Sequence, residues 1–363
     1  MELEGILKAV CAKGASDLHL VIGMPPMIRV RGEILPLDGF PILSADDTKN
    51  LIYSVLFQDH RSKFEEEWEL DTSIQVEGLA RFRVNVMVEK DGIEAVLRVI
   101  SYKIPTPQEL GLTPEMIAIS DLMRGLILVT GPTGSGKSTT LACLLNLINE
   151  KHQKTVITIE DPIEFVYENN KSVFRQREVG QHTKSFTEAL RRSLRQDPDV
   201  ILVGEMRDLE TISLAITAAE TGHLCFGTLH TMDAAQTVDR IIDVFPAHQQ
   251  QQIRVQLATV LVSVISQNLL PSKDGTGRVA AREFMINTPA IANNIREGKT
   301  HMIYQAIDTS AKLGMFPLDR NLADLVRTGK VTRDEAISHA RNPQALINML
   351  GAGQAGMSMA AMR

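Results

Sequence analysis

The stretch that most constrains this chain is a glycine-rich segment near its middle. An apolar run at 126–130 precedes it, and residues 139–150 after it carry leucine and isoleucine at helical spacing. A strand, a glycine-rich loop and a helix in this order are the context that a P-loop requires. The segment reads Gly131, Pro132, Thr133, Gly134, Ser135, Gly136, Lys137 and Ser138.

These residue types suit a polyphosphate. Glycines allow backbone N–H groups to turn inward around the phosphates, and the helix that follows adds the positive end of its dipole. Lys137 is placed to reach the outer phosphates, and the Ser138 hydroxyl is placed to bind Mg²⁺. We therefore predict that residues 131–139, including Thr139, bind a nucleoside triphosphate and that Ser138 is a Mg²⁺ ligand.

Length and charge limit the classes of protein that the chain can belong to. At 363 residues it exceeds what one hydrophobic core usually fills, so we expect two domains. The net charge of −6 and the pI near 5.9 argue against nucleic acid as the main partner, because binding to a phosphate backbone normally requires a basic surplus.

Cysteines and apolar runs bear on the compartment. Cys11, Cys143 and Cys225 are scattered, which is typical of a reducing compartment and provides no zinc motif. We expect no signal peptide, since the first residues are acidic. The uncharged run 255–272 contains polar residues and a proline, and we interpret it as a buried helix rather than a membrane span.

Residues 1–102 are predicted to form a small α+β domain. The alternating segment 81–88 returns as 93–100 after a turn, which indicates a β-hairpin. Closely spaced prolines make 103–107 the expected linker.

Three arginines lie on this hairpin: Arg81, Arg83 and Arg98. A solvated strand face is the simpler interpretation of them. The functional alternative is that they reach a triphosphate at a domain or subunit interface, where a planar guanidinium stabilises developing charge.

The rest of the chain, 108–350, is predicted to form a RecA-like α/β domain. Apolar, strand-like runs alternate with helical patterns, which is typical of a mostly parallel sheet. Beyond Asp233 the pattern is mainly helical, and the Gly-, Ala- and Met-rich tail 351–363 is predicted to be disordered. The strand-like runs are 126–130, 156–159, 200–203 and 224–229.

Hydrolysis requires acids beside the P-loop. The run 197–205 is an apolar strand that ends in Glu205, the form of a Walker B element, and we assign Glu205 to the Mg²⁺ shell. A second strand-like run ends in Glu160, Asp161 and Glu164. Each of these acids is a candidate general base, and spacing does not decide between them; a simple turn at Asp161 is the structural alternative.

Histidines flank the apolar run 224–229. On one continuous strand His223 and His230 would face opposite ways, so we do not expect them to share a metal ion. One of them could report the γ-phosphate, whereas hydrogen-bonded histidines at the strand ends are the simpler interpretation.

These segments, in this order, resemble the secretion ATPase superfamily of type II and type IV secretion and of type IV pilus motors, and within it the pilus retraction ATPases. The resemblance covers almost the whole chain. It includes the opening 14–20 with 25–27, the segment 81–85, the P-loop, an Asp box at 158–164, the Walker B stretch and a His box at 216–231.

The resemblance implies roles for single residues. Glu164 corresponds to the catalytic glutamate, Glu205 to the Walker B acid, and His223 and His230 to the His box. Arg83 and Arg98 match arginines that contact the phosphates, and Arg81 lies beside them on the same hairpin. The family fold is a PAS-like domain joined to a RecA-like domain.

The resemblance also implies an assembly. Family members are cytoplasmic ring hexamers that hydrolyse ATP with Mg²⁺ and act on an inner-membrane platform protein at the pilus base. The missing four-cysteine zinc motif favours retraction over extension. The segment 290–297 keeps most of a retraction-associated motif but has Ala292 and Asn294 at two of its positions. The alternatives are an accessory retraction paralogue, another secretion ATPase, a nucleotide-dependent switch or scaffold, and a nucleic-acid translocase.

Overall fold

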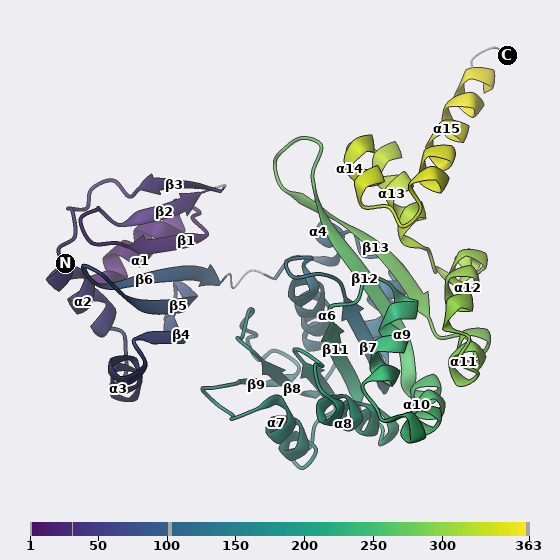
Figure 1. Ribbon diagram of the computed structural model, residues 1–363, viewed down its shortest axis with the longest axis horizontal. Coiled ribbons are helices and arrows are strands. Elements are labelled where there is room, and N and C mark those ends of the chain that lie inside the picture. Colours follow the sequence, from purple (N-terminus) through teal and green to yellow (C-terminus); the bar gives the residue numbers. More distant parts are fainter. Residues whose placement is uncertain (1, 31, 101–103, 361–363) are drawn as a thin grey trace. The chain divides into compact units, whose positions relative to one another are not determined.

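The chain divides into two compact units, Met1–Lys103 and Ile104–Arg363. The structure is a computed structural model that describes residues 2–30, 32–100 and 104–360. Figure 1 labels the elements of each unit. The first residue of the expected linker 103–107 lies outside the described residues, and so do 101 and 102 at the end of the predicted first domain.

The N-terminal unit is one antiparallel sheet with helices packed on one face. The strand order is β3-β2-β1-β6-β5-β4. Apolar residues of the helices and of one sheet face form its core, among them Ile6, Leu18 and Phe82. Its elements are α1 (Leu3–Ala12), β1 (Asp17–Leu20), β2 (Met27–Val30), β3 (Glu33–Pro36), α2 (Ala45–Tyr53), α3 (Gln58–Glu67), β4 (Glu69–Val76), β5 (Ala80–Glu89) and β6 (Gly92–Ile100).

The predicted hairpin is confirmed as β5 and β6, which pair along their length. Phe82, Val84 and Val86 are buried on one face, whereas Val88, near the turn, is half exposed. Arg83 and Arg98 face each other across the pair on the opposite side of the sheet. The alternation in sequence therefore decides which side chains enter the core.

The chain re-enters regular structure earlier than expected. The predicted linker includes Pro107, but this residue begins α4 (Pro107–Leu110). Thr106 and Glu109 form a capping box around the helix start. Proline is favoured at the first position of a helix, because the missing N–H would have no partner there.

The C-terminal unit contains a seven-stranded sheet in the order β13-β12-β7-β11-β10-β8-β9. Neighbouring strands are parallel except β12 and β13, which form an antiparallel pair at one edge. The predicted α/β class is confirmed. Strands and helices up to the edge pair are α5 (Pro114–Ile117), η1 (Ala118–Asp121), β7 (Gly125–Thr130), α6 (Lys137–Lys151), β8 (Thr155–Glu160), β9 (Val173–Glu178), α7 (Phe186–Ser193), β10 (Val200–Val203), α8 (Leu209–Glu220), β11 (Leu224–Leu229), α9 (Ala234–Asp243), α10 (Ala247–Val260), β12 (Leu261–Pro271) and β13 (Arg278–Ile286).

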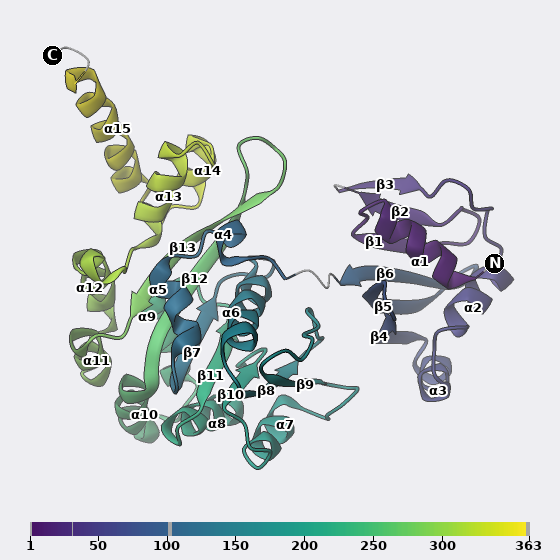
Figure 2. The ribbon, with the colours of Figure 1, turned by 180° about the vertical axis from the view of Figure 1, so that it is seen from behind.

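Helices cover both faces of this sheet (Figure 2). Leu144 of α6 packs with Ile127 and Phe226 of the central strands on one face. Ile212 of α8 and Val238 of α9 lie in the core on the other face. Because both faces are covered, the central strands are apolar throughout, and β7, β10 and β11 are fully buried.

The region after Asp233 differs from its prediction. We expected it to be mainly helical and interpreted 255–272 as one buried helix, but α10 ends at Val260 and the run continues as β12. A continuous apolar run looks the same in a buried strand and in a buried helix. The β-branched residues Val262, Val264 and Ile265 favour the strand.

Helices follow the edge pair to the end of the described chain. They are α11 (Pro289–Arg296), η2 (Thr300–Met302), α12 (Ile303–Thr309), η3 (Ala311–Leu313), α13 (Leu318–Arg327), α14 (Arg333–Ser338) and α15 (Pro343–Ala360). We predicted disorder for 351–363, whereas α15 extends to Ala360. Residues 361–363 lie outside the described residues.

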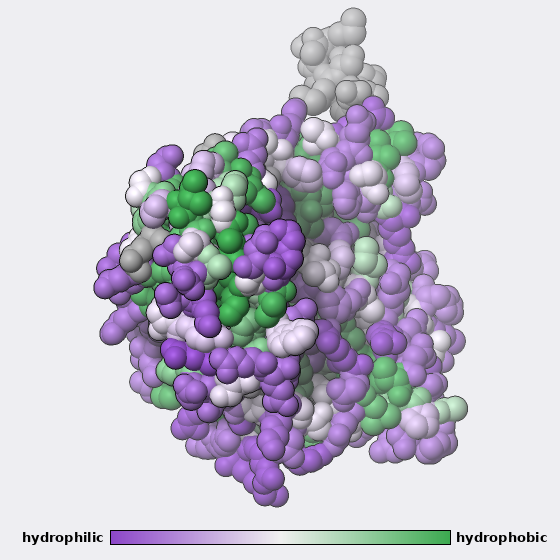
Figure 3. Space-filling view, turned by 60° about the vertical axis from the view of Figure 1, so that its left-hand side comes forward, coloured by the Kyte–Doolittle hydropathy of each residue, from purple (hydrophilic) through white to green (hydrophobic). Residues whose placement is uncertain are grey.

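Among the described residues, no helix has both the length and the apolar character needed to span a bilayer. The surface face in Figure 3 is mixed, with apolar patches between hydrophilic side chains.

Candidate functional site

The P-loop joins the carboxyl end of β7 to the first turn of α6. Gly131 has φ +139°, and a Cβ there would lie 2.1 Å from the Gln267 carbonyl oxygen. Gly136 precedes the helix in the left-handed region, at φ +85°. A side chain at either position would be strained. Gly134 also has a positive φ, +78°, so backbone geometry as well as access to phosphate favours glycine at all three predicted positions.

The loop is suited to an anion. Lys137 Nζ donates hydrogen bonds to the carbonyl oxygens of Gly131 at 2.9 Å and Pro132 at 3.0 Å, which curls the loop around the ammonium group. Burial lowers the pKa of Lys137, and the carboxylates of Glu205 and Glu164 oppose this effect. The first N–H groups of α6 have no partner within the helix. The Ser135 hydroxyl is buried with no hydrogen-bond partner among the described residues.

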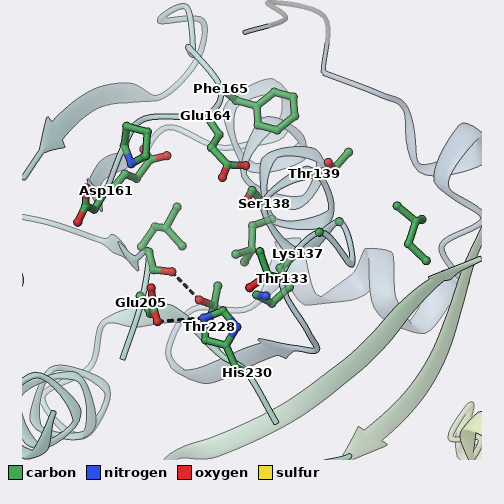
Figure 4. Close-up of a pocket in the computed structure, with 18 of the residues that line it drawn as sticks. Thr133, Lys137, Ser138, Thr139, Asp161, Glu164, Phe165, Glu205, Thr228 and His230 are labelled. Carbon is green, nitrogen blue, oxygen red and sulfur yellow. Dashed lines mark hydrogen bonds and ion pairs between the residues drawn. The ribbon is translucent and has the colours of Figure 1, made fainter. Parts of the chain in front are cut away.

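A pocket of about 500 Å³ opens over this loop. It lies at the carboxyl ends of the parallel strands, where open α/β sheets bind ligands. Figure 4 shows ten of its residues labelled. Predicted site residues that line it are Thr133, Gly134, Gly136, Lys137, Ser138, Thr139, Glu160, Asp161, Glu164, Glu205 and His230.

Glu205 follows β10, as a Walker B acid does, and two side chains, His230 and Arg207, hold its carboxylate. His230 Nε2 lies 2.9 Å from its Oε1 atom, and Arg207 Nε lies 2.5 Å from the same atom. Burial opposes the charge of Glu205, but hydrogen bonds and charge from Arg207 and His230 outweigh burial and lower its pKa. Glu205 is therefore an ionised carboxylate, the form that binds Mg²⁺. With the Ser138 hydroxyl in the same pocket, the oxygen donors fit this ion.

The acids after β8 occupy different environments. Glu160 is buried and accepts a hydrogen bond from the Thr158 hydroxyl at 2.5 Å and one from Gln176 at 3.3 Å. Burial raises the pKa of Glu160 to about 7. Glu164 is exposed, and its carboxylate points towards Ser138 and the start of α6, whereas Asp161 lies at the far side of the pocket (Figure 4).

This arrangement bears on the choice that spacing left open. A general base must reach a water molecule beside the phosphates. Both acids line the pocket, but the Glu164 carboxylate points towards Ser138 (Figure 4), whereas hydrogen bonds hold Glu160 against its own strand and its neighbour β9. The geometry favours Glu164.

The two histidines lie at opposite ends of β11. His230 enters the pocket and contacts Glu205. His223 Nδ1 lies 2.9 Å from the Ala218 carbonyl oxygen at the end of α8, and His223 does not line the pocket. His223 is thus a candidate that the structure does not bring to the site.

The arginines belong to the N-terminal unit. Arg98 Nε donates to Asp17 Oδ1 at 2.8 Å, and this aspartate is buried in β1. Arg83 is exposed on the same sheet face. Arg81 is buried and bonded to the Ser73 hydroxyl, so its nearest role is structural.

Sequence reasoning missed several residues of the pocket. Arg207 holds Glu205, and Arg278, at the start of β13, lines the opening. The position of Arg207 two residues after the Walker B acid could have indicated the pair. Arg278 could not be placed while β13 was unrecognised.

Comparison with known proteins identifies the family of this chain. Residues 3–314 match the model of the family described as Type II/IV secretion system protein. The chain is 52% identical over 344 residues to the type IV pilus retraction ATPase PilT of Pseudomonas aeruginosa, an alignment that covers 95% of this chain and 99% of that protein. It is 38% identical to the type IV pilus ATPase PilU of the same organism, over 97% of this chain and 92% of that one.

A solved structure agrees. A crystal structure of the pilus retraction motor PilT with bound ADP superposes with a TM-score of 0.90 at 46% identity, covering 96% of this chain and 99% of that chain. The family match, the full-length relatives and the P-loop pocket agree, and the chain belongs to the Type II/IV secretion system protein family as one of its secretion ATPases.

Proposed function

We propose that this chain is the ATPase motor that powers retraction of type IV pili. The observation that carries the proposal is the meeting of Lys137, Glu164 and Glu205 in one pocket at the P-loop. The full-length similarity to PilT gives the direction of the work. A switch or scaffold needs no general base, so Glu164 beside the P-loop favours hydrolysis over binding alone.

Each residue has a role in this proposal. Backbone N–H groups of 133–137 and the Lys137 ammonium bind the phosphates of ATP. Ser138 and Glu205 hold Mg²⁺, which offsets phosphate charge when bound. Glu164 accepts the proton of the attacking water, and His230 keeps Glu205 in place. Phosphoryl transfer needs little more than this positioning and charge compensation.

The arginines would complete the charge compensation. We propose that Arg83 and Arg98 reach the triphosphate bound by a second subunit or by the C-terminal unit of their own chain. A guanidinium group suits this role because it is planar and always charged. Arg81 would support the sheet that carries them.

The proposed assembly is a cytoplasmic homohexamer at the inner face of the inner membrane. Its partner would be the membrane platform protein at the pilus base, with no direct insertion of this chain. Nucleic acid has no place in the proposal, since the chain carries a net charge of −6.

The test is surface piliation and twitching motility in a strain that lacks this chain. Complementation uses the wild type and Lys137→Ala. Excess, immobile pili that only the wild type restores to normal support retraction powered by this P-loop. Bald cells would indicate extension. Normal piliation and motility would favour an accessory paralogue or another secretion ATPase.

A further inference from the structure

A buried amide lies directly behind the P-loop. Gln267 belongs to β12, next to β7 in the sheet, and its side chain is only 2% exposed. Its Nε2 atom donates to the Ser135 carbonyl oxygen at 2.7 Å. Its Oε1 atom accepts from the Thr140 hydroxyl at 2.9 Å. One side chain thus holds the loop and the first turn of α6 together.

The surroundings permit a single orientation of this amide. Arg282 Nε lies 3.4 Å from Oε1, and a guanidinium group can only donate hydrogen bonds. Arg282 is itself fixed, since it is 4% exposed and its Nη1 donates to the Leu110 carbonyl oxygen at 2.8 Å. The Ser135 carbonyl can only accept. Exchange of the amide oxygen and nitrogen would place acceptor against acceptor and donor against donor.

The amide determines how the loop presents its N–H groups. In a trans peptide the C=O and the following N–H point to opposite sides of the chain. Because Gln267 holds the Ser135 carbonyl on the β12 side, the Gly136 N–H faces the other way. Among the described residues, none accepts a hydrogen bond from the Gly136 N–H. This N–H is thus available to a phosphate oxygen.

Gln267 also sets the shape of the loop at both ends. Its backbone carbonyl oxygen would lie 2.1 Å from a Cβ at Gly131, and its side-chain Nε2 atom 3.2 Å from a Cβ at Gly136. The strand therefore packs closely against the loop at these two glycines. Bulk on either side would push the loop away from β12.

We infer that Gln267 is a positioning residue for the phosphate-binding loop, acting through the Ser135–Gly136 peptide, with Arg282 fixing its orientation. The inference rests on the proposed binding of nucleotide at the P-loop. Gln267 touches no phosphate in this account. Its effect is on the direction of one backbone donor, so it governs nucleotide affinity more than chain stability.

The test is ADP affinity, measured by calorimetry on the full chain, for the wild type, Gln267→Glu and Gln267→Met. Glutamate keeps the acceptor for Thr140 and Arg282 but faces the Ser135 carbonyl with a second acceptor, so ADP binding should weaken about tenfold. Methionine removes all three hydrogen bonds at similar length, and binding should weaken at least as much. Gln267→Met also allows ADP affinity to be measured if the buried charge of Gln267→Glu prevents folding.

Matched variants separate the possible failures. Ser266 precedes Gln267 in β12 and accepts a buried hydrogen bond from the Thr130 hydroxyl of β7. Ser266→Ala removes this bond without touching 131–136, and it should change ADP affinity less than twofold. Lys137→Ala should abolish binding, and ADP affinity equal to wild type in that variant would overturn the proposed site itself. If Lys137→Ala loses binding while both Gln267 variants bind as the wild type does, the inference is wrong. The inference would also be contradicted if the Gln267 variants melted at a lower temperature but bound ADP as tightly as Ser266→Ala. Gln267 would then be structural only.

Discussion

The P-loop and the arginine-bearing face of the N-terminal sheet both carry charged side chains. They differ in how far groups of opposite charge in the same unit offset that charge. Lys137 has the carboxylates of Glu164 and Glu205 in its own pocket, within one unit. Arg83 is exposed, and among the described residues no acceptor for its guanidinium is found. The C-terminal unit thus holds the phosphate-binding loop and both acids, whereas the role proposed for Arg83 requires a phosphate bound outside the N-terminal unit.

The largest expected effect on nucleotide binding tests the C-terminal unit. Lys137→Ala removes the ammonium group that curls the loop and faces the phosphates, so ATP hydrolysis should fall by a factor of about 100 or more, with loss of nucleotide binding. The control is Lys151→Ala, at the other end of α6, where the lysine pairs with Asp121 outside the pocket. Steady-state phosphate release from both variants is the measurement. Equal turnover in the two would contradict the assignment.

A smaller effect sharpens the contrast with the N-terminal unit. Arg83→Ala should lower turnover at least about tenfold while the melting temperature changes little, because an exposed strand arginine contributes little to stability. Lys63→Ala removes another exposed cation of the same unit, one paired with Glu67, and should change neither quantity. Wild-type turnover of Arg83→Ala would return this arginine to a solvated strand face.

The smallest effect concerns stability and pH. Burial raises the pKa of Glu160 from 4.5 to about 7 in the folded chain. The folded state binds this proton more tightly than the unfolded state, so the stabilisation is fully present below about pH 4.5 and is lost as the pH rises through 7. Glu160→Gln has no such proton. Its melting temperature relative to wild type should rise by about 5–10 °C between pH 5 and pH 8, equivalent to roughly 2–3 kcal/mol.

The control for that experiment is Glu168→Gln, an exposed acid a short way along the chain. Its difference from wild type should stay flat over the same range. A flat difference for Glu160→Gln as well would show that its proton does not contribute to folding.

The sequence predicted the P-loop more completely than the acids around it. The P-loop was predicted residue by residue, because its glycines, its lysine and its flanking elements are contiguous and each obeys a local rule. The choice among Glu160, Asp161 and Glu164 depended on which carboxylate turns into the pocket. Side-chain direction at the end of a strand comes from packing against β9 and α6, which spacing does not encode.

The missed elements have one cause. An apolar run without periodicity fits a buried helix and a buried strand equally well, so β12 was not recognised in 255–272. Because β12 was missed, its antiparallel partner β13 was missed as well. Gln267, Arg278 and Arg282 therefore could not be placed from the sequence. The polar residues in that run were interpreted as signs against a membrane span, whereas Gln267 holds the phosphate-binding loop.

The central claim is that this pocket hydrolyses ATP with Glu164 as general base. The most direct test compares ATP binding with steady-state hydrolysis in Glu164→Gln, with Glu168→Gln as the matched control. We predict that Glu164→Gln binds ATP within a few-fold of the wild-type affinity while turnover falls by a factor of about 10²–10⁴. Wild-type turnover in Glu164→Gln would remove this residue from the mechanism and contradict the account.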